Sequence, residues 1–504
     1  MRHILVCIAI CLTFFAWGQG TPDQMNSALL SGKIKKYDRS IPFTAYVQRL
    51  GLPSLQVNID VDSNGTFSQS IPIDLLSEIY LVYKTSFVIL LQPKDNLKLI
   101  FDGDKNSMAK VLESIEYAGD HAKTNQDIST FFKIYYSDAR LFKMWEEQLK
   151  SFKEMEIEEY KSHIQNRLKI ATDIFQAFDA SYHPNDECKS WIRTDLKNKY
   201  FDDLGHYPMN HREQNNFLPF DTTQVVPAKY FEQLKEWLPL TTEQLKNTQT
   251  LNAVASSFYF YLYELMAKEG KLPKDIDIIP SGGILGPTKV VDSLMINSTI
   301  DIVEDPLLRE IMLTTAFSRS LAKQSVNLYE NNYAIIDKYI TKPYLKDQLF
   351  NIYKQTKTEI ETPIPLNEAL KVHEFSSGIE EIFKQIIAKN KNKVIYVDIW
   401  SPWCGPCLKE MPNSKKLEQK LKNKAVSFIY ICVFSDEDRY LRTLNKLQLG
   451  GEHYFLNSQQ SVDLSKIFNI PGIPYYIYID KNGVMKEKGS HLRPEVMESK
   501  LNDI

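Results

Sequence analysis

Residues Ile395 to Pro412 read IYVDIWSPWCGPCLKEMP, and this stretch organises the C-terminal part of the chain. The largely apolar run Val394 to Trp400 is followed at once by Trp403-Cys404-Gly405-Pro406-Cys407, after which an amphipathic segment begins. The apolar run predicts a buried strand, Gly-Pro a tight turn, and the amphipathic segment a helix. We therefore expect the two cysteines to lie where a strand meets a helix.

The spacing of these cysteines predicts redox chemistry, because two cysteines separated by Gly-Pro at a helix start can close a small disulfide ring. Cys404 should face the free N–H groups and the positive end of the helix dipole, which favour thiolate over thiol. The thiolate is the species that attacks disulfides. Cys407, one turn further in, is placed to attack the mixed disulfide and release the product. A C-x-x-C pair can also be half of a zinc site, but the sequence holds no second C-x-x-C and no His pair at ligand spacing.

These residues also carry a family resemblance. The pattern Trp403 to Cys407, with Asp398 six residues before the first cysteine and Pro412 eight after it, resembles thioredoxin. The ending Lys-Glu-Met-Pro and an N-terminal export signal make it similar to the TlpA/ResA-like thiol–disulfide oxidoreductases. The run Ile470 to Pro474 before a short strand also matches. The resemblance covers residues 371–504 and implies a thioredoxin-type α/β fold there.

The resemblance implies a proton-relay role for Asp398. A carboxyl group held beneath the cysteine pair has a raised pKa and can move a proton to or from Cys407. The alternative is an aspartate at a strand end that merely reaches solvent. The residues alone do not separate these two interpretations, and the resemblance favours the relay.

The remaining site residues follow from the same resemblance. It implies that Pro474 is cis and lies against the disulfide, where the adjoining backbone pairs with an extended substrate chain. It implies that Trp403 covers the disulfide and that Gly405 and Pro406 set the turn and accompany a reducing pair. Ile473, before the proline, also resembles thioredoxin.

Two other cysteines leave alternatives open. Cys432 lies on the second predicted long strand, where it is either a third thiol close to the site or a small buried hydrophobe, which is the commoner use of a free cysteine. Cys188 is either buried or a capture point for a partner thiol. The histidines are scattered and indicate no metal centre.

Length and composition indicate a soluble globular protein of several domains. The chain has 504 residues, of which 43% are hydrophobic and 24% charged, and the net charge is −3. A length of this order accommodates two to four domains. The near-neutral balance offers no basic field for nucleic acid, so we expect no nucleic-acid partner.

The first eighteen residues read as a secretory signal peptide. Arg2 and His3 precede the apolar run Ile4 to Trp17, and small residues at Ala16 and Gly18 predict cleavage before Gln19. The run is short for a membrane span. A lipid anchor at Cys11 would need small residues before it, and Ile8-Ala9-Ile10 stands there instead. We expect a periplasmic protein, with membrane association as the alternative.

The remaining chain divides by composition into three parts and a linker. Short β-rich runs, with a turn at Asp62-Ser63-Asn64-Gly65, predict a small β-sandwich over residues 19–118. That segment resembles the β domain of unknown function that often precedes bacterial thioredoxin-like domains. Residues 119–361 read as mainly α-helical, and the apolar stripe from Ile128 to Phe152 predicts one long amphipathic helix. Residues 362–370 read as a proline-containing linker into the last domain.

These observations predict an exported thiol–disulfide oxidoreductase that reduces protein disulfides in the periplasm. It needs no organic cofactor or metal, because the cysteine pair is itself the redox group. Its electrons must come from a thiol donor protein, for which a membrane protein is one candidate. The alternatives are a disulfide isomerase, a thiol peroxidase-like antioxidant, and a partner-binding protein in which redox chemistry is secondary.

Overall fold

The computed structural model describes the residues 26–215, 228–271, 277–278, 284–285, 288–362, 372–373, 378–435 and 437–502. The expected signal peptide, residues 1–18, and the expected linker beyond residue 362 lie outside the described residues. The described chain forms two compact units, of which the first contains residues up to 321 with 326–355, and the second 322–325 with 356 onward. Within the described ranges, no helix combines the length and apolar character that a bilayer crossing needs.

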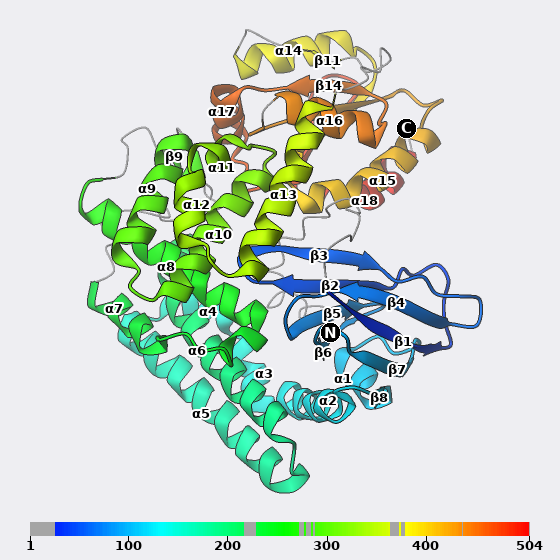
Figure 1. Ribbon diagram of the computed structural model, residues 1–504. Helices are drawn as coiled ribbons and strands as arrows, with labels where there is room; N and C mark the ends of the chain where they lie inside the picture. The colour runs from blue at the N-terminus through cyan, green and yellow to red at the C-terminus, as the bar shows by residue number, and fades with distance from the viewer. Residues whose placement is uncertain are drawn as a thin grey trace. The chain divides into compact units, whose positions relative to one another are not determined.

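The N-terminal unit begins with two four-stranded sheets (Figure 1). The first sheet has the strand order β4(Thr66–Pro72), β1(Ser27–Lys35), β7(Asn96–Asp102), β8(Glu116–Gly119). The second has the order β3(Leu52–Asn58), β2(Thr44–Arg49), β5(Ser77–Val82), β6(Ser86–Leu91). The buried faces of both sheets contribute to one core, as the edge-to-face contact of Phe43 with Phe67 at 5.2 Å between ring centroids illustrates.

The expected turn at Asp62 to Gly65 is present: Val61 and Phe67 pair antiparallel across it, and the chain passes there from β3 of one sheet to β4 of the other. The Asp62 carboxylate accepts hydrogen bonds from the backbone N–H groups of Asn64 and Thr66, at 2.8 and 2.9 Å. Gly65 has a φ of 78°, and a Cβ atom there would lie 2.3 Å from the carbonyl oxygen of Ile34, so only glycine fits. After this turn, β4 pairs with β1.

A helical region follows the sheets, beginning with short helices. Their bounds are α1(Met108–Ser114), α2(Ala122–Ser137), α3(Ala139–Glu146) and α4(Gln148–Glu154). The single long helix expected over Ile128 to Phe152 is therefore wrong. Asp138 adopts an extended conformation, and its carboxylate accepts hydrogen bonds from the backbone N–H groups of Arg140 and Leu141, which begins a new helix. The apolar stripe continues across this break, so periodicity alone did not reveal it.

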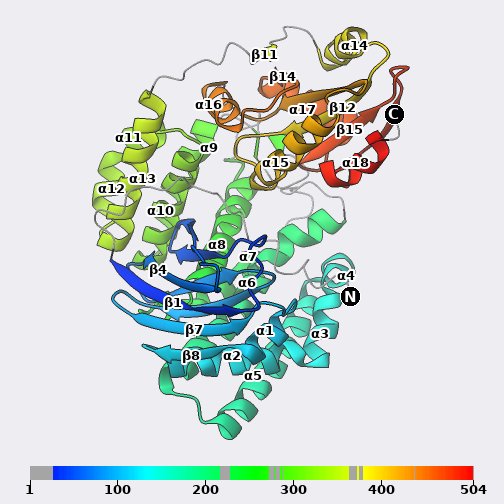
Figure 2. The ribbon, with the colours of Figure 1, turned by 90° about the vertical axis from the view of Figure 1, so that its right-hand side faces the viewer.

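The next two helices are long and complete the core beneath the sheets. They are α5(Ile157–Tyr182) and α6(Asp186–Gln214). One continuous hydrophobic core contains Leu30 of β1, Phe131 of α2, Phe178 of α5 and Trp191 of α6. Figure 2 shows β4, β1, β7 and β8 side by side with α2 next to β8. Strands and helices in this unit therefore share one core.

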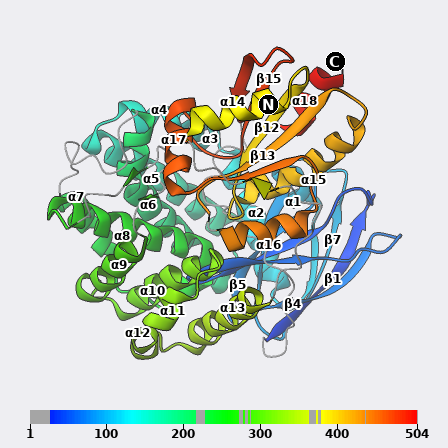
Figure 3. The same cartoon turned by 90° about the horizontal axis from the view of Figure 1, so that it is seen from above.

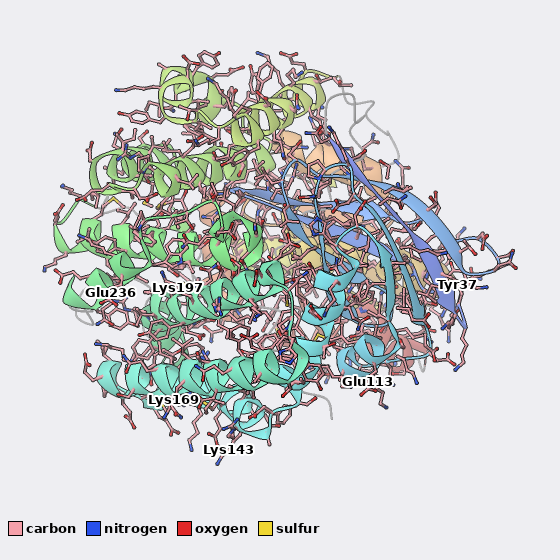
Figure 4. The ribbon with its side chains drawn as sticks, turned by 60° about the horizontal axis from the view of Figure 1, so that its bottom comes forward. Tyr37, Glu113, Lys143, Lys169, Lys197 and Glu236 are labelled. Atoms are coloured by element: carbon pink, nitrogen blue, oxygen red, sulfur yellow. A yellow bond between two sulfur atoms is a disulfide. The ribbon has the colours of Figure 1, made fainter. Side chains whose placement is uncertain are left out.

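Further helices complete the N-terminal unit around a second core. Their bounds, with two short strands, are α7(Ala228–Glu232), α8(Thr248–Lys268), β9(Asp277–Ile278), β10(Ile284–Leu285), α9(Thr288–Ile302), α10(Pro306–Ala322), α11(Asn327–Asn331), α12(Tyr333–Tyr339) and α13(Pro343–Glu361). Two 3₁₀ turns, Gln233–Trp237 and Gln244–Lys246, lie between α7 and α8. Figure 4 labels exposed Lys143, Lys169, Lys197, Glu113 and Glu236, so charges of both signs are interspersed on this unit.

The C-terminal unit is a six-stranded sheet with helices on both faces (Figure 3). The strand order is β11(Val372–His373), β14(Glu452–Phe455), β13(Val426–Cys432), β12(Val394–Trp400), β15(Tyr475–Ile479), β16(Met485–Gly489). The first four strands are parallel, and β15 and β16 are antiparallel to their neighbours. The helices are α14(Ile379–Lys389), α15(Gly405–Lys420), α16(Glu437–Leu447), α17(Ser458–Phe468) and α18(Pro494–Asn502). This is the thioredoxin-like arrangement expected for residues 371–504.

We predict that residues 371–504 fold alone, because they contain the whole sheet and all five of these helices. The structure adds a refinement at the N-terminal end. The Arg442 guanidinium of α16 donates hydrogen bonds to the carbonyl oxygens of Glu359, Ile360 and Thr362, which such a fragment lacks. A fragment starting at Thr356 should therefore be more stable to denaturant by about 1 kcal/mol.

Comparing urea unfolding of the two fragments tests this prediction. The Arg442→Ala change should remove the difference between them. A fragment 371–504 that is soluble only as an unfolded chain would show that it does not fold as an independent domain.

Candidate active site

The two cysteines of the C-G-P-C motif form a disulfide at the start of α15. The Sγ–Sγ distance is 1.96 Å and the Cα atoms are 5.2 Å apart. Cys404 is the N-cap residue, and its Sγ accepts a hydrogen bond of 3.1 Å from the backbone N–H of Cys407. Gly405 and Pro406 occupy the first helical turn, where proline fits because its missing N–H would be unpaired anyway. The helix start thus directs a backbone N–H and its dipole at the Cys404 sulfur.

The side chains of β12, the strand before this junction, point alternately to the two faces of the sheet. Every residue of β12 is buried. Ile395, Val397 and Ile399 belong to the hydrophobic cluster on one face of the sheet. Tyr396 and Trp400 belong to the cluster on the other face, which also contains both cysteines. Since side chains alternate along a strand, Asp398 projects to the face that carries the disulfide.

Access to the disulfide is limited. The exposed fractions of Cys404 and Cys407 are 3% and 1%. Trp403 is half-buried beside the cluster that contains both cysteines, and its indole Nε1 donates a hydrogen bond of 2.7 Å to the carbonyl oxygen of Phe434. This bond holds the indole ring in one orientation next to the cysteine pair.

Asp398 is buried and has a strongly raised pKa. Its exposed fraction is 2%, so it is not a strand-end carboxylate in solvent. Burial raises the pKa of Asp398 to about 8, and the nearby Glu410 carboxylate contributes in the same direction. A hydrogen bond from the Ser414 hydroxyl, at 3.4 Å, opposes the rise in pKa slightly. The carboxyl group is therefore largely protonated at neutral pH.

The Asp398 carboxyl group accepts a hydrogen bond from the Ser414 hydroxyl, on the helix that also carries Cys407. Cys407 and Ser414 are both buried on α15 and lie on one face of it. They are seven positions apart, which corresponds to about 10 Å along a helix axis. Any proton exchange between Asp398 and Cys407 therefore needs either a side-chain movement or an intermediary group.

Glu410, for which the sequence predicted no role, lies on the same helix as Cys407 and Ser414. Its carboxylate is buried on α15 and pairs with the Arg493 guanidinium at 2.8 Å. The side chain of Glu410 is 10% exposed and that of Arg493 is 48% exposed, so this pair reaches from the interior to the surface. Glu410 lies three residues after Cys407, and this spacing on a helix could have identified it.

The predicted substrate-binding turn adjoins the cysteine pair. The peptide bond between Ile473 and Pro474 is cis, the form that the resemblance implies. Ile473 packs against the hydrophobic cluster that contains Cys404 and Cys407. The turn leads directly into β15, the neighbour of β12.

Cys188 and Cys432, which lie outside the Cys404–Cys407 disulfide, are both buried, with exposed fractions of 0%. Cys432 belongs to the same cluster as the disulfide, and burial raises the pKa of the Cys188 thiol. A capture role for Cys188 is therefore disfavoured, because its sulfur is inaccessible. Across the described residues, no group of three or more His, Cys, Asp or Glu side chains is arranged to hold a metal ion.

Comparison with known proteins identifies the C-terminal domain. The Redoxin family model matches residues 384–504. Thiol-disulfide oxidoreductase ResA of Bacillus thuringiensis subsp. konkukian is 24% identical over 110 residues, which cover 21% of this chain and 62% of that protein. Thioredoxin-like protein YneN of Bacillus subtilis is 25% identical over 159 residues, covering 30% of this chain and 88% of that protein. This chain thus spans only 62% of the length of the first of these relatives.

Among solved structures, the thioredoxin domain of a thiol-disulfide oxidoreductase from Bacteroides vulgatus is similar over 23% of this chain and 81% of that chain. The identity is 22% and the TM-score is 0.22.

Proposed function

We infer that this protein, whose residues 384–504 form a redoxin domain, is a thiol–disulfide oxidoreductase that reduces protein disulfides. The domain is similar to TlpA/ResA-like proteins of the thioredoxin superfamily. The observation that supports this function is the Cys404–Cys407 disulfide at the first turn of α15. The cysteine pair is the redox group, so the reaction requires no other cofactor.

The first step is attack by the Cys404 thiolate on a substrate disulfide. A bond forms between the Cys404 sulfur and one substrate sulfur, and the substrate disulfide breaks. The other substrate sulfur leaves as a thiolate and takes a proton from water. The backbone N–H of Cys407, which already points at the Cys404 sulfur, and the helix dipole stabilise the attacking thiolate.

The second step is release by Cys407. The Cys407 thiol gives its proton to the Asp398 carboxylate, and its sulfur then attacks the Cys404 sulfur. The Cys404–Cys407 bond forms, the bond to substrate breaks, and the second substrate thiolate leaves and is protonated. The substrate has gained two electrons, which a thiol donor protein must return to the cysteine pair.

Because the protein reduces its substrates, we expect the Cys404–Cys407 pair to have a low reduction potential. Gly405-Pro406 between the cysteines, and Ile473 before Pro474, are similar to thioredoxin. We therefore expect a potential near that of thioredoxin, about −270 mV, rather than the value of about −120 mV of a strong periplasmic oxidase. Equilibration of the full chain with glutathione or dithiothreitol buffers measures it. A value at the oxidase end would assign the protein to disulfide formation.

We propose that the protein acts after export, in the periplasm. The proposal rests on the charged start, apolar run and small residues of the first eighteen positions. N-terminal sequencing of exported material should begin at Gln19. Material that keeps Met1, or that carries a lipid on Cys11, would contradict it.

A Cys404→Ser/Cys407→Ser double variant separates this function from a partner-binding role. If thiol exchange is the function, the variant should lose all reduction of a model protein disulfide and the associated phenotype. A variant that keeps the phenotype would identify binding, and not redox chemistry, as the function.

A further inference from the structure

Several buried side-chain oxygen atoms near the candidate site lack a hydrogen-bond partner among the described protein groups, and three of them lie on adjacent strands of the sheet. These three are Asp398 Oδ1, the hydroxyl of Tyr430 and the hydroxyl of Tyr476. The exposed fractions of the three residues are 2%, 1% and 0%. A buried polar group that stays unpaired costs about 1–3 kcal/mol, so three of them together call for a common explanation.

The sheet places these three side chains next to one another. Asp398 on β12 is in register with Tyr430 on β13 and with Tyr476 on β15. Tyr430 and Tyr476 both belong to the hydrophobic cluster on the disulfide face. Asp398 projects to the same face, so the two phenols flank the carboxyl group from both neighbouring strands.

The electrostatic coupling of the three groups agrees with this placement. Burial is the main cause that raises the pKa of both tyrosines; the Asp398 charge comes next for Tyr476, whereas for Tyr430 it follows the larger effect of the Glu418 charge. The Glu410 charge adds to the effect on Tyr476, and the Arg493 charge opposes it. Tyr476 therefore lies within electrostatic reach of both the buried carboxyl group and the Glu410–Arg493 pair.

The spacing between the groups suits water better than direct contact. Neighbouring strands are about 4.8 Å apart, and a hydrogen bond between oxygen atoms spans about 2.8 Å. A phenol oxygen also lies farther from the sheet than a carboxylate oxygen of the adjacent residue. One water molecule spans such a gap with two hydrogen bonds, and buried water typically serves polar atoms of this kind.

Building on the proposed function, we propose that Tyr430 and Tyr476 are positioning residues for Asp398, and that their hydroxyls hold water against its carboxyl group. The bound water donates hydrogen bonds to Asp398 Oδ1 when the carboxyl group is ionised. It thereby stabilises the carboxylate that accepts the Cys407 proton in the release step.

The water held by the two tyrosines does not change which bonds form and break in the release step. The Cys407 proton is accepted by the Asp398 carboxylate, as in the proposed function. The sulfur–sulfur bonds form and break as in the proposed function. Neither tyrosine is oxidised or loses its proton, since each hydroxyl only orients the water.

Tyr430→Phe and Tyr476→Phe test the proposal, because each removes one oxygen and keeps the ring. The readout is the pKa of Asp398 in the oxidised full-length protein, followed by carboxyl ¹³C NMR and assigned with Asp398→Asn. We expect each single variant to raise the pKa, and the double variant to raise it by about one pH unit. In the double variant, the ionised fraction of Asp398 at pH 7 should fall about tenfold, and the rate at which a mixed disulfide is released should fall by the same factor.

Tyr396→Phe is the matched control. Tyr396 lies on the same face, stacks on Tyr476 at 5.6 Å between ring centroids, and is equally buried. Burial and then the Asp398 charge raise its pKa as well, so electrostatic coupling to Asp398 does not distinguish it from the other two tyrosines. Its hydroxyl, however, donates a hydrogen bond of 2.6 Å to the carbonyl oxygen of Leu492. Removing it should lower stability and leave the Asp398 titration unshifted.

An unchanged Asp398 pKa in both single variants, or an equal shift in Tyr396→Phe, would overturn the proposal. The NMR titration requires no catalysis, so it is independent of the proposed function. A wild-type protein that exchanges no disulfides would refute that function while leaving the titration result intact.

Discussion

Replacing Cys407 with serine is expected to convert the protein into a trap that holds its partners as mixed disulfides. Cys404 would keep its place at the N-cap of α15, where the helix N–H groups and dipole stabilise its thiolate by roughly 0.3–1 kcal/mol when exposed and up to about 2 when partly buried. It would therefore still attack, but no resolving sulfur would remain to break the bond. Turnover should fall to background, and non-reducing gels with mass spectrometry of captured partners measure the trap.

Cys404→Ser is the control for this experiment. Cys407 lies inside the first helical turn with an exposed fraction of 1%, so a lone thiol there should capture almost nothing. Both variants lose the disulfide, so a loss of stability alone would affect them equally. If Cys404→Ser is the better trap, the assignment of nucleophile and resolving cysteine is reversed.

Replacing Asp398 with asparagine is expected to stabilise the oxidised protein at alkaline pH. Burial raises the pKa of Asp398 to about 8 in the folded protein, from the ordinary value of 3.8 for an exposed aspartate. The unfolded chain therefore releases this proton between about pH 4 and pH 8 while the folded chain keeps it. In the wild-type protein, the protonated Asp398 side chain contributes its full share of folding stability below about pH 4, and this stability is lost as the pH rises through 8. The variant should gain up to about 5 kcal/mol at pH 8, from about four pH units at 1.36 kcal/mol each, and little at pH 4.

Hydrogen exchange of peptides from β12, measured in oxidised protein at both pH values, tests this effect within the C-terminal unit. Asp480→Asn provides a control of opposite sign. The pKa of Asp480 is lowered, chiefly by the backbone N–H of Val484, so its carboxylate contributes stability that is lost as pH falls. Equal gains in Asp398→Asn at pH 4 and pH 8 would mean that ionisation of a buried carboxyl group is not the cause.

The junction around the disulfide could be predicted from the sequence because its determinants are local. An apolar run, Cys-Gly-Pro-Cys and an amphipathic segment fall within eighteen residues, Ile395 to Pro412. The residues alone left the burial of Asp398 open, and only the family resemblance favoured a buried carboxyl group. The thioredoxin-like fold of the C-terminal unit was likewise expected from that resemblance.

Features that depend on distant residues could not be predicted in this way. Asp138 fits the polar face of a continuous helix as well as it fits a cap, so the break after α2 was missed. Tyr430 and Tyr476 flank Asp398 only through strand order and register, which no short pattern encodes. The Glu410–Arg493 pair joins residues that are 83 positions apart.

The core shared by β1 and α6 determines when the N-terminal unit can fold. Leu30 of β1 and Trp191 of α6 are buried in one cluster, so β1 cannot complete its core until α6 has been synthesised. Such non-local contacts raise the contact order and slow folding. Until α6 has emerged, the growing chain carries unpaired strand edges and uncovered apolar side chains, the state in which aggregation competes with folding. A chain shortened to its strands would remain in that state, and holding chaperones would be needed to keep it soluble.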